Sequence, residues 1–293
     1  MPIKHAVPLP VEPLSDERLS AAAAKLPAAP RIFQQLSAAI RDPDVSVESM
    51  VTVVRLDPVL SARVIRASNS PYFARGGHIV SLDGAIERIG IYEVYQLVGA
   101  AVASQLYSAG LPVYGITGDQ LWENSVTTAV ALDSLSDAGG EDGRVGYTLG
   151  LLRPVGRLLL QRIASEYTCA PLIGRHSSAA LVEAWEMETL GATSTEAITR
   201  VFQLWEYPLP LTQPIRYQFK PTADPSLSRM TALLHAASWV AAELGKGLAI
   251  EQDAWSVDAP ILEQACINEA AVDRCVERTR RIAERLNGLL RVT

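Results

Sequence analysis

Two arginines inside an apolar run are the residues whose placement most strongly suggests chemistry. Arg153 and Arg157 lie four positions apart in GLLRPVGRLLL, residues 150–160, and Pro154 directly follows the first of them. A proline inside a helix removes a backbone donor and clashes with the preceding turn, so we expect one helix to end at Arg153 and another to begin at Pro154. Both cations would then accompany the positive N-terminus of the second helix, an arrangement that requires an anion.

The sequence offers two sources for this anion. On a helical wheel of residues 181–191, LVEAWEMETLG, Glu188 falls on the apolar face, where a carboxylate is costly unless it is paired. Glu183 and Glu186 fall on the polar face and are expected to be solvated. We favour an internal ion pair between Glu188 and the two arginines over an external phosphate or nucleotide bound at the helix N-terminus. The apolar face used for this assignment also carries Leu181, Ala184 and Trp185.

Other constellations that could support catalysis are weak. The sequence has no GxSxG elbow, no phosphate-binding P-loop and no GxGxxG pattern. Its three cysteines include no CxxC pair, which indicates reduced thiols rather than a zinc site. The histidines have no HxxxH or HExxH spacing, so we expect neither a metal nor another cofactor. The three cysteines are Cys169, Cys266 and Cys275, and the four histidines are His5, His78, His176 and His235.

Helical periodicity and helix caps dominate the chain and predict an all-α fold. Thr117 and Gln120 have the spacing of a capping box, and Asp57 with Pro58 is a favourable helix start. Further expected caps are Ser46 and Ser194 at helix starts and Gly90, Gly191 and Gly245 at helix ends.

Concentrations of glycine and proline suggest a division of the chain. The turn-rich stretch 108–119 is the best internal boundary. We expect a proline-rich leader over 1–19, an N-terminal helical subdomain over 20–115, a second helical subdomain over 116–245 and a C-terminal tail over 246–293. The tail mixes arginine and glutamate at helical spacing and predicts an amphipathic closing helix.

Composition excludes several classes of function. The net charge of -6 creates no long-range field that would attract nucleic acid. No apolar stretch has the length of a membrane span, and the N-terminus lacks the apolar core of a secretory signal. We therefore expect a soluble cytoplasmic protein without nucleic-acid or membrane partners.

Several segments in a characteristic order carry a resemblance to a known family. LPAAPRIFQQLSAAIRDPDVSVESMVTVVRLDPVLSARVIRASNSPYF and VSLDGAIERIG are followed by LWENSVTTAVAL, YTLGLLRPVGRLLL and METLGATSTEAITRVFQLWEYPLP. Together with ALLHAASWVAAELG, these segments resemble the HDOD family, the HD-related output domain of bacterial signalling proteins. The resemblance covers about residues 25–245 and implies an N-terminal helical subdomain followed by an HD-like one.

The family is related to HD phosphohydrolases, in which histidine and aspartate ligands bind divalent metal. By this resemblance, the first histidine is replaced by Asn124, the His-Asp pair falls on Arg153 and Pro154, and the last aspartate is replaced by Ser238. Asparagine and serine are feeble ligands, proline offers none, and an arginine would repel a divalent cation. The resemblance therefore implies a degenerate site without metal.

We expect a non-enzymatic signalling or scaffolding protein that acts through contacts with other signalling proteins. Arg63 and Arg66, three residues apart on one helix face, are a possible partner surface, although the helix that carries them could be purely structural. The alternatives are a divergent metal-dependent phosphodiesterase or phosphohydrolase, and a sensor that binds an anion or nucleotide without turnover.

Overall fold

Helices form all of the regular secondary structure in the described part of the chain, which confirms the all-α prediction. The computed structural model describes residues 13–25, 35, 46–74, 76–166, 178–205 and 207–291. Within these ranges, the only strand-like pairing is an isolated bridge between Leu111 and Ile116. None of the described helices is both long enough and apolar enough to cross a membrane.

Three of the expected N-caps begin helices where the sequence predicts them. Ser46, Asp57 and Thr117 each accept backbone N–H groups at a helix start, and Thr117 forms the expected capping box with Gln120. The cap of the helix at Ser194 is shifted by one residue, because Thr193 is the N-cap and Ser194 is the first helical residue. The helices concerned are α3 (Val47–Val54), α4 (Pro58–Ser68), α7 (Gly118–Ala138) and α11 (Ser194–Leu204).

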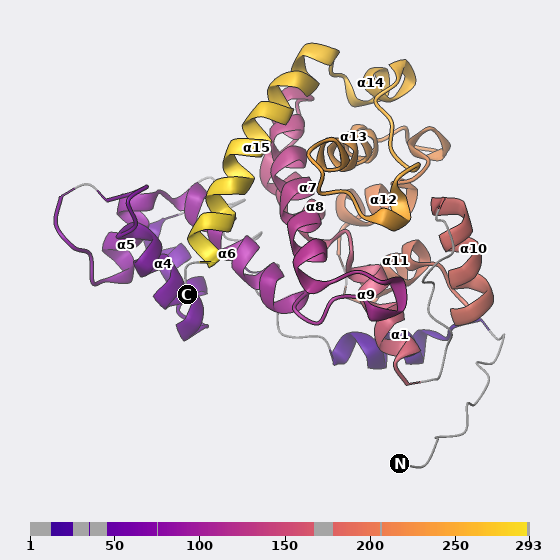
Figure 1. Ribbon diagram of the computed structural model, residues 1–293, viewed down its shortest axis with the longest axis horizontal. Coiled ribbons are helices and arrows are strands. Elements are labelled where there is room, and N and C mark those ends of the chain that lie inside the picture. The colour runs from indigo at the N-terminus through magenta and orange to yellow at the C-terminus, as the bar shows by residue number, and fades with distance from the viewer. Residues whose placement is uncertain are drawn as a thin grey trace.

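Four helices form an N-terminal subdomain at one end of the molecule. α3 and α4 pack against α5 (Leu82–Ile89), and α6 (Ile91–Leu106) packs against all three. Gly90 joins α5 to α6 with a φ of 96°, a backbone conformation that favours glycine. Figure 1 shows α4 and α5 on the left, with α6 leading from them toward the larger part of the molecule.

The larger part is organised around α7. This helix packs against α8 and α13, while α9 packs against α11. A short 3₁₀ helix, Pro112–Tyr114, connects α6 to α7 and packs against α9. The remaining helices of this larger part, which the resemblance expects to be HD-like, are α8 (Gly143–Leu152), α9 (Val155–Ala164), α10 (Ala179–Leu190), α12 (Leu209–Tyr217) and α13 (Arg229–Glu243).

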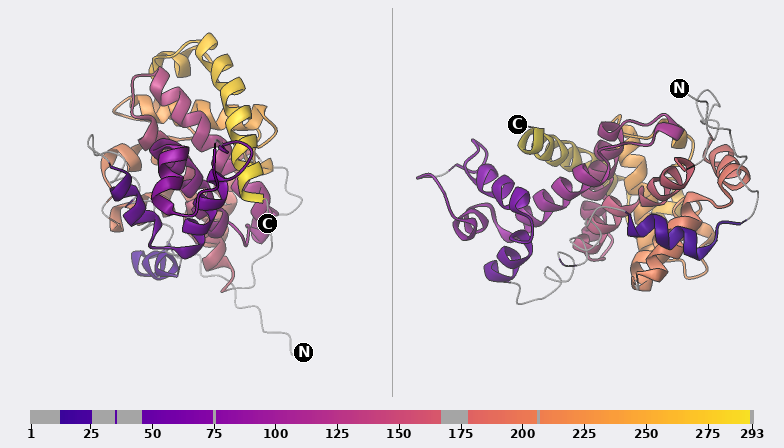
Figure 2. Two further views of the ribbon diagram at one scale, coloured as in Figure 1. Left: turned by 90° about the vertical axis from the view of Figure 1, so that its left-hand side faces the viewer. Right: turned by 90° about the horizontal axis from the view of Figure 1, so that it is seen from below.

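The two ends of the described chain both pack on the HD-like part. α1 (Asp16–Ala24) begins inside the segment expected to be a leader and packs on α9 and α11, remote from the other N-terminal helices (Figure 1). At the other end, α14 (Ala259–Ala265) contacts α13, and α15 (Glu269–Arg291) lies along α7. The last turns of α15 reach the N-terminal subdomain (Figure 2).

Candidate functional site

A break between α8 and α9 positions the two arginines of the candidate site. Arg153 is the C-cap of α8 and Pro154 is the N-cap of α9, so the new helix begins one residue later than expected. Both residues keep right-handed helical φ and ψ angles. The side chains of Arg153 and Arg157 therefore project toward the same region.

Arg153 is held by a carboxylate from the C-terminal segment. One of its terminal nitrogens, Nη1, lies 2.9 Å and 3.0 Å from the two carboxylate oxygens of Glu251. Its other terminal nitrogen donates to Oδ1 of Asn124. The guanidinium carbon lies 5.2 Å from the ring centre of Trp255. Arg153 and Glu251 are both buried, so this cation is fully enclosed by protein.

Arg157 links the same carboxylate to a second one. It donates to Oε1 of Glu251, and its Nε lies 3.5 Å from Oε1 of Glu186. Its guanidinium carbon is 5.8 Å from the ring centre of Phe219. Two buried arginines thus face two buried glutamates. We call Arg153, Arg157, Glu186 and Glu251 the buried ion cluster.

Glu186 is held in place by groups on three other elements. Its Oε2 accepts a hydrogen bond of 2.6 Å from the backbone N–H of Ser194 at the start of α11. Its Oε1 accepts one of 3.1 Å from the hydroxyl of Tyr114. Burial raises the pKa of Glu186, and the nearby Arg157 and these hydrogen bonds offset only part of that effect.

The pKa of Glu251 is shifted in the opposite direction, below its ordinary value. Burial acts to raise its pKa, but the two adjacent guanidinium groups, with their hydrogen bonds, outweigh burial and hold the pKa below its ordinary value. Glu251 is therefore the ionised partner on which both cations depend.

The prediction that Glu188 pairs with the arginines was wrong. Glu188 is exposed, whereas Glu186 is buried and faces Arg157. The helical wheel was oriented by Leu181 and Ala184, which are both exposed in α10. The buried face of this helix instead comprises Val182, Trp185, Glu186 and Leu190.

The other degenerate positions have structural hydrogen bonds or none. Asn124 donates from Nδ2 to the backbone carbonyl of Lys246 at 2.8 Å. Ser238 donates to the carbonyl of Leu234, 2.9 Å away in its own helix. Pro154 has no side-chain donor or acceptor. Asn124 and Ser238 are buried.

His235, the histidine nearest to these positions in sequence, has both ring nitrogens engaged. Its Nδ1 is 2.8 Å from the carbonyl of Gln218, and the backbone N–H of Ser256 points to its Nε2 at 3.1 Å. This pattern fits a neutral imidazole that donates through Nδ1 and accepts through Nε2. Burial lowers its pKa, and the bond to Gln218 offsets part of that effect.

The side chains at the positions that the resemblance assigns to the metal ligands do not fit a divalent metal. Arg153 carries a guanidinium there, and the carboxylate of Glu251 beside it already serves two cations. Among the described residues, no three histidine, cysteine, aspartate or glutamate side chains converge as a metal site would require. We therefore derive no step through a metal. His5, His176 and Cys169 lie outside the described residues.

Arg63 and Arg66 differ in exposure, contrary to the expectation that both are free at the surface. Arg63 is half-buried and donates to the hydroxyl of Ser104 on α6 at 3.3 Å. Arg66 is exposed. Only one of the pair is therefore fully available to a partner.

The sequence prediction missed Glu251, Trp255 and Phe219. Glu251 and Trp255 lie in the segment 246–293, which was expected to be a C-terminal tail. An available signal was the alternation of Leu248 and Ile250 there, because both are buried and anchor the segment that carries Glu251. Nothing comparable marks Phe219.

Comparisons with known proteins agree with this architecture. The family model described as HDOD domain matches residues 26–221. A crystal structure of an HDOD domain protein from Geobacter sulfurreducens aligns with a TM-score of 0.68 and 18% identity, over 94% of this chain and 99% of that one. A candidate phosphohydrolase from Shewanella amazonensis SB2B aligns with a TM-score of 0.63 and 24% identity, over 93% and 98% of the two chains. At these identities the structural matches show a shared fold.

Two further relatives are longer than this chain. A candidate signal-transduction protein from Marinobacter aquaeolei VT8 aligns with a TM-score of 0.68 and 20% identity, over 94% of this chain but 64% of that one. An uncharacterised protein from Treponema pallidum is 26% identical over 140 residues, which are 46% of this chain and 26% of that protein. The chain thus spans only part of the length of these two relatives.

Proposed function

Because this chain belongs to the HDOD domain family, we propose that it is a non-catalytic signalling protein that acts through contacts with other proteins. The observation that carries the proposal is the carboxylate of Glu251 on the guanidinium of Arg153, a residue that the resemblance assigns to the metal-ligand pair of HD phosphohydrolases. A cation held there by a buried carboxylate leaves no ligand set that could activate water. The fold would then serve as a scaffold.

The pairing of the arginines supports an internal anion over an external one. The carboxylate of Glu251 contacts both Arg153 and Arg157, and Glu186 places a second carboxyl group beside Arg157. The aromatic rings of Trp255 and Phe219 lie against the same guanidinium groups. A phosphate or nucleotide at the start of α9 would have to displace a buried carboxylate, which makes the anion sensor at this site the weaker proposal.

A hydrolysis assay tests the proposal against a divergent phosphodiesterase. The purified full-length chain is incubated with cyclic dinucleotides and with bis(p-nitrophenyl) phosphate, in the presence of Mn²⁺ or Mg²⁺. We expect no turnover above the rate with metal alone. Metal-dependent turnover above that rate would support the enzyme and refute the scaffold.

The proposal that this chain acts through contacts with other proteins is tested by identifying a binding partner. Affinity capture from the source cells, followed by titration of the purified partner, should give saturable binding to the full chain. Equal binding by a heat-unfolded sample would show that the captured protein recognises exposed chain rather than this fold.

A further inference from the structure

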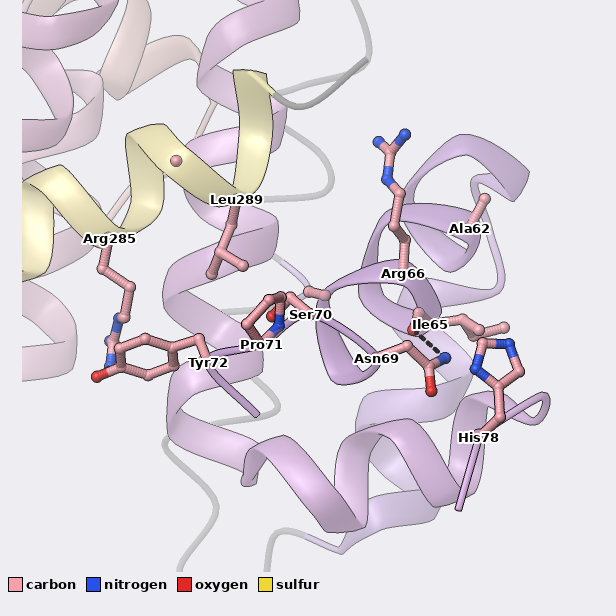
Figure 3. A pocket seen from close by; sticks show the side chains of 12 residues that line it. Ala62, Ile65, Arg66, Asn69, Ser70, Pro71, Tyr72, His78, Arg285 and Leu289 are labelled. Atoms are coloured by element: carbon pink, nitrogen blue, oxygen red, sulfur yellow. Dashed lines mark hydrogen bonds between the residues drawn. The ribbon is translucent and has the colours of Figure 1, made fainter. Parts of the chain in front are cut away.

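A large apolar pocket lies between the N-terminal subdomain and the last turns of α15. Its volume is about 1080 Å³. One wall is formed by α4 with the nearby His78, and the other by α15 with Pro71 and Tyr72 (Figure 3). Arg285 and Leu289 extend from α15 toward Pro71 and Tyr72 in this view. None of the residues that line the pocket belongs to the buried ion cluster.

The walls are apolar and the charged groups are all basic. Ala62, Ile65, Pro71 and Leu289 supply hydrophobic surface, and Arg66 and Arg285 supply cations. No aspartate or glutamate lines the pocket, although the whole chain carries a net charge of -6. This local excess of positive charge is complementary to an anion.

Polar atoms at the pocket lack partners among the described residues. The guanidinium of Arg66 is exposed and forms no ion pair there. Arg285 donates from Nη1 to the hydroxyl of Tyr72 at 3.0 Å, but its Nε has no hydrogen-bond partner. The hydroxyl of Ser70, also in the lining, is buried without a partner. Of these groups, the exposed guanidinium of Arg66 is the one directly accessible to a ligand.

We propose that this pocket binds a small amphipathic anion, with an apolar body between α4 and α15 and a single anionic group near the exposed guanidinium of Arg66. Its volume is at the upper end of the roughly 300–1,000 Å³ of small-molecule sites. Apolar walls disfavour a densely charged polyphosphate, because burying its charges would be costly. A neutral lipid would leave Arg66 without an ionic partner.

The ligand would join two parts of the chain. α4 belongs to the N-terminal subdomain, whereas α15 packs along α7 of the HD-like part. A molecule that contacts both walls stabilises their present arrangement, because it binds this state more tightly than one with the walls apart. The pocket is therefore suited to signal input. This inference goes beyond the proposed function and does not depend on whether the HD position is catalytic.

Binding is tested on the full-length chain with two anionic probes, 1-anilinonaphthalene-8-sulfonate by fluorescence and dodecanoate by calorimetry below its micellar concentration. Dodecyltrimethylammonium, with the same tail and the opposite charge, is the control ligand. We expect saturable binding of both anions, a higher melting temperature in their presence, and weaker binding of the cation.

Gly288 provides a variant that fills the pocket without disturbing the fold. It lines the pocket, and a Cβ placed there meets no atom within 4 Å. Gly288→Leu should occupy part of the volume and reduce the affinity for both anions, while Gly288→Ala should bind nearly as the wild type does. Both changes replace a helical glycine and so should not lower the melting temperature without ligand.

Charge is tested separately with Arg66→Glu. The affinity for dodecanoate should fall about tenfold or more, the effect of losing roughly one charge-assisted hydrogen bond. Arg281→Glu makes the same change at an exposed position of α15 outside the lining and should leave the affinity within about twofold.

Two results would overturn the proposal. One is the absence of saturable binding of either anion to the folded wild type. The other is binding that is unchanged in both Gly288→Leu and Arg66→Glu, which would place the probe elsewhere on the molecule. A failure of this kind would leave the hydrolysis and partner experiments unaffected.

Discussion

At the scale of single residues, one buried cation is paired with one buried carboxylate. Arg153 lies at a position that, by the resemblance to HD phosphohydrolases, would belong to a metal ligand, and Glu251 neutralises it from a distant part of the sequence. Buried ion pairs contribute little net stability, but removing one partner leaves an uncompensated buried charge. The cluster therefore makes the position of Glu251 a strict requirement of the fold.

Glu251→Gln should lower the free energy of unfolding by about 3–5 kcal/mol, because Arg153 and Arg157 lose their shared carboxylate. Glu188→Gln is the matched control, since it makes the same chemical change on an exposed side chain and should alter stability by less than about 0.5 kcal/mol. Urea denaturation at neutral pH measures both. A larger effect at Glu188 would reverse the assignment of the paired carboxylate.

The effect of Glu251→Gln should also depend on pH. The pKa of Glu251 is lowered in the folded protein, so its contribution is present above the pKa of the unfolded chain and is lost as pH falls through the folded value. The stability difference between wild type and variant should therefore be smaller near pH 3 than near pH 7. A difference that does not vary over this range would show that the carboxylate is not the ionised partner of the arginines.

The glutamates of α10 show how much of the site the sequence alone could predict. The position of Arg153 and Pro154 in an apolar run signals a buried cation and hence an internal or external anion. The choice among Glu183, Glu186 and Glu188 requires the rotation of α10 about its axis, which tertiary packing determines. Glu251 lies 98 residues from Arg153, and no local pattern relates the two.

At the scale of elements, close approach between helices fixes where the cluster forms. Gly156 in the first turn of α9 faces α11, and a Cβ there would lie 2.0 Å from the carbonyl oxygen of Ser194. The same turn carries Arg157, and the backbone N–H of Ser194 holds Glu186. Caps predict the boundaries of these helices well because capping is local, whereas their contact depends on the whole fold.

Gly156→Ala should destabilise the protein by about 1–3 kcal/mol, because α9 and α11 would have to separate. Gly288→Ala, where the added methyl group meets open space, should instead stabilise it by about 0.5–1 kcal/mol. Thermal unfolding of the two variants and the wild type provides the comparison. Equal effects would mean that α9 and α11 are not as close as the structure places them.

A buried aspartate on α7 gives an independent pH dependence. Burial raises the pKa of Asp133 to about 7, an effect that hydrogen bonds from Tyr92 and Gln96 oppose. The folded state then holds a proton that the unfolded chain releases, so stability falls as pH rises from about 4 to about 7.

Asp133→Asn removes this titration while keeping an oxygen that can accept from Tyr92. The variant should gain stability relative to wild type as pH rises across that range, by at most about 4 kcal/mol. Denaturant midpoints measured at several pH values test this. A constant difference between the two proteins would place the pKa of Asp133 near its unfolded value.

At the scale of the whole molecule, the C-terminal segment completes the fold. The tail expected over 246–293 supplies Glu251 and Trp255 to the cluster, and α15 covers α7 along the HD-like part (Figure 1). The segment resembles a tail in sequence because its glutamates and arginines are interleaved. Its buried residues, including Val272, Cys275 and Leu286, contact the main core only once the chain has folded.

A chain truncated after Gly245 should therefore fail to fold cooperatively, although it retains every segment that resembles the family. It leaves Arg153 and Arg157 without Glu251 and exposes the face of α7 that α15 covers. Circular dichroism during urea denaturation should show no sharp transition. A stable, cooperative fragment would show that the C-terminal segment is dispensable.

The central claim is that an internal ion cluster has replaced the metal at the HD position. Its most direct test is the metal content of the full-length protein, measured by inductively coupled plasma mass spectrometry after equilibration with Mn²⁺, Fe²⁺ and Mg²⁺ and removal of free ions. The account predicts far less than one ion of any of these metals per chain, because Arg153 occupies the site. A stoichiometric ion that is lost when Glu251 is changed to alanine would contradict it.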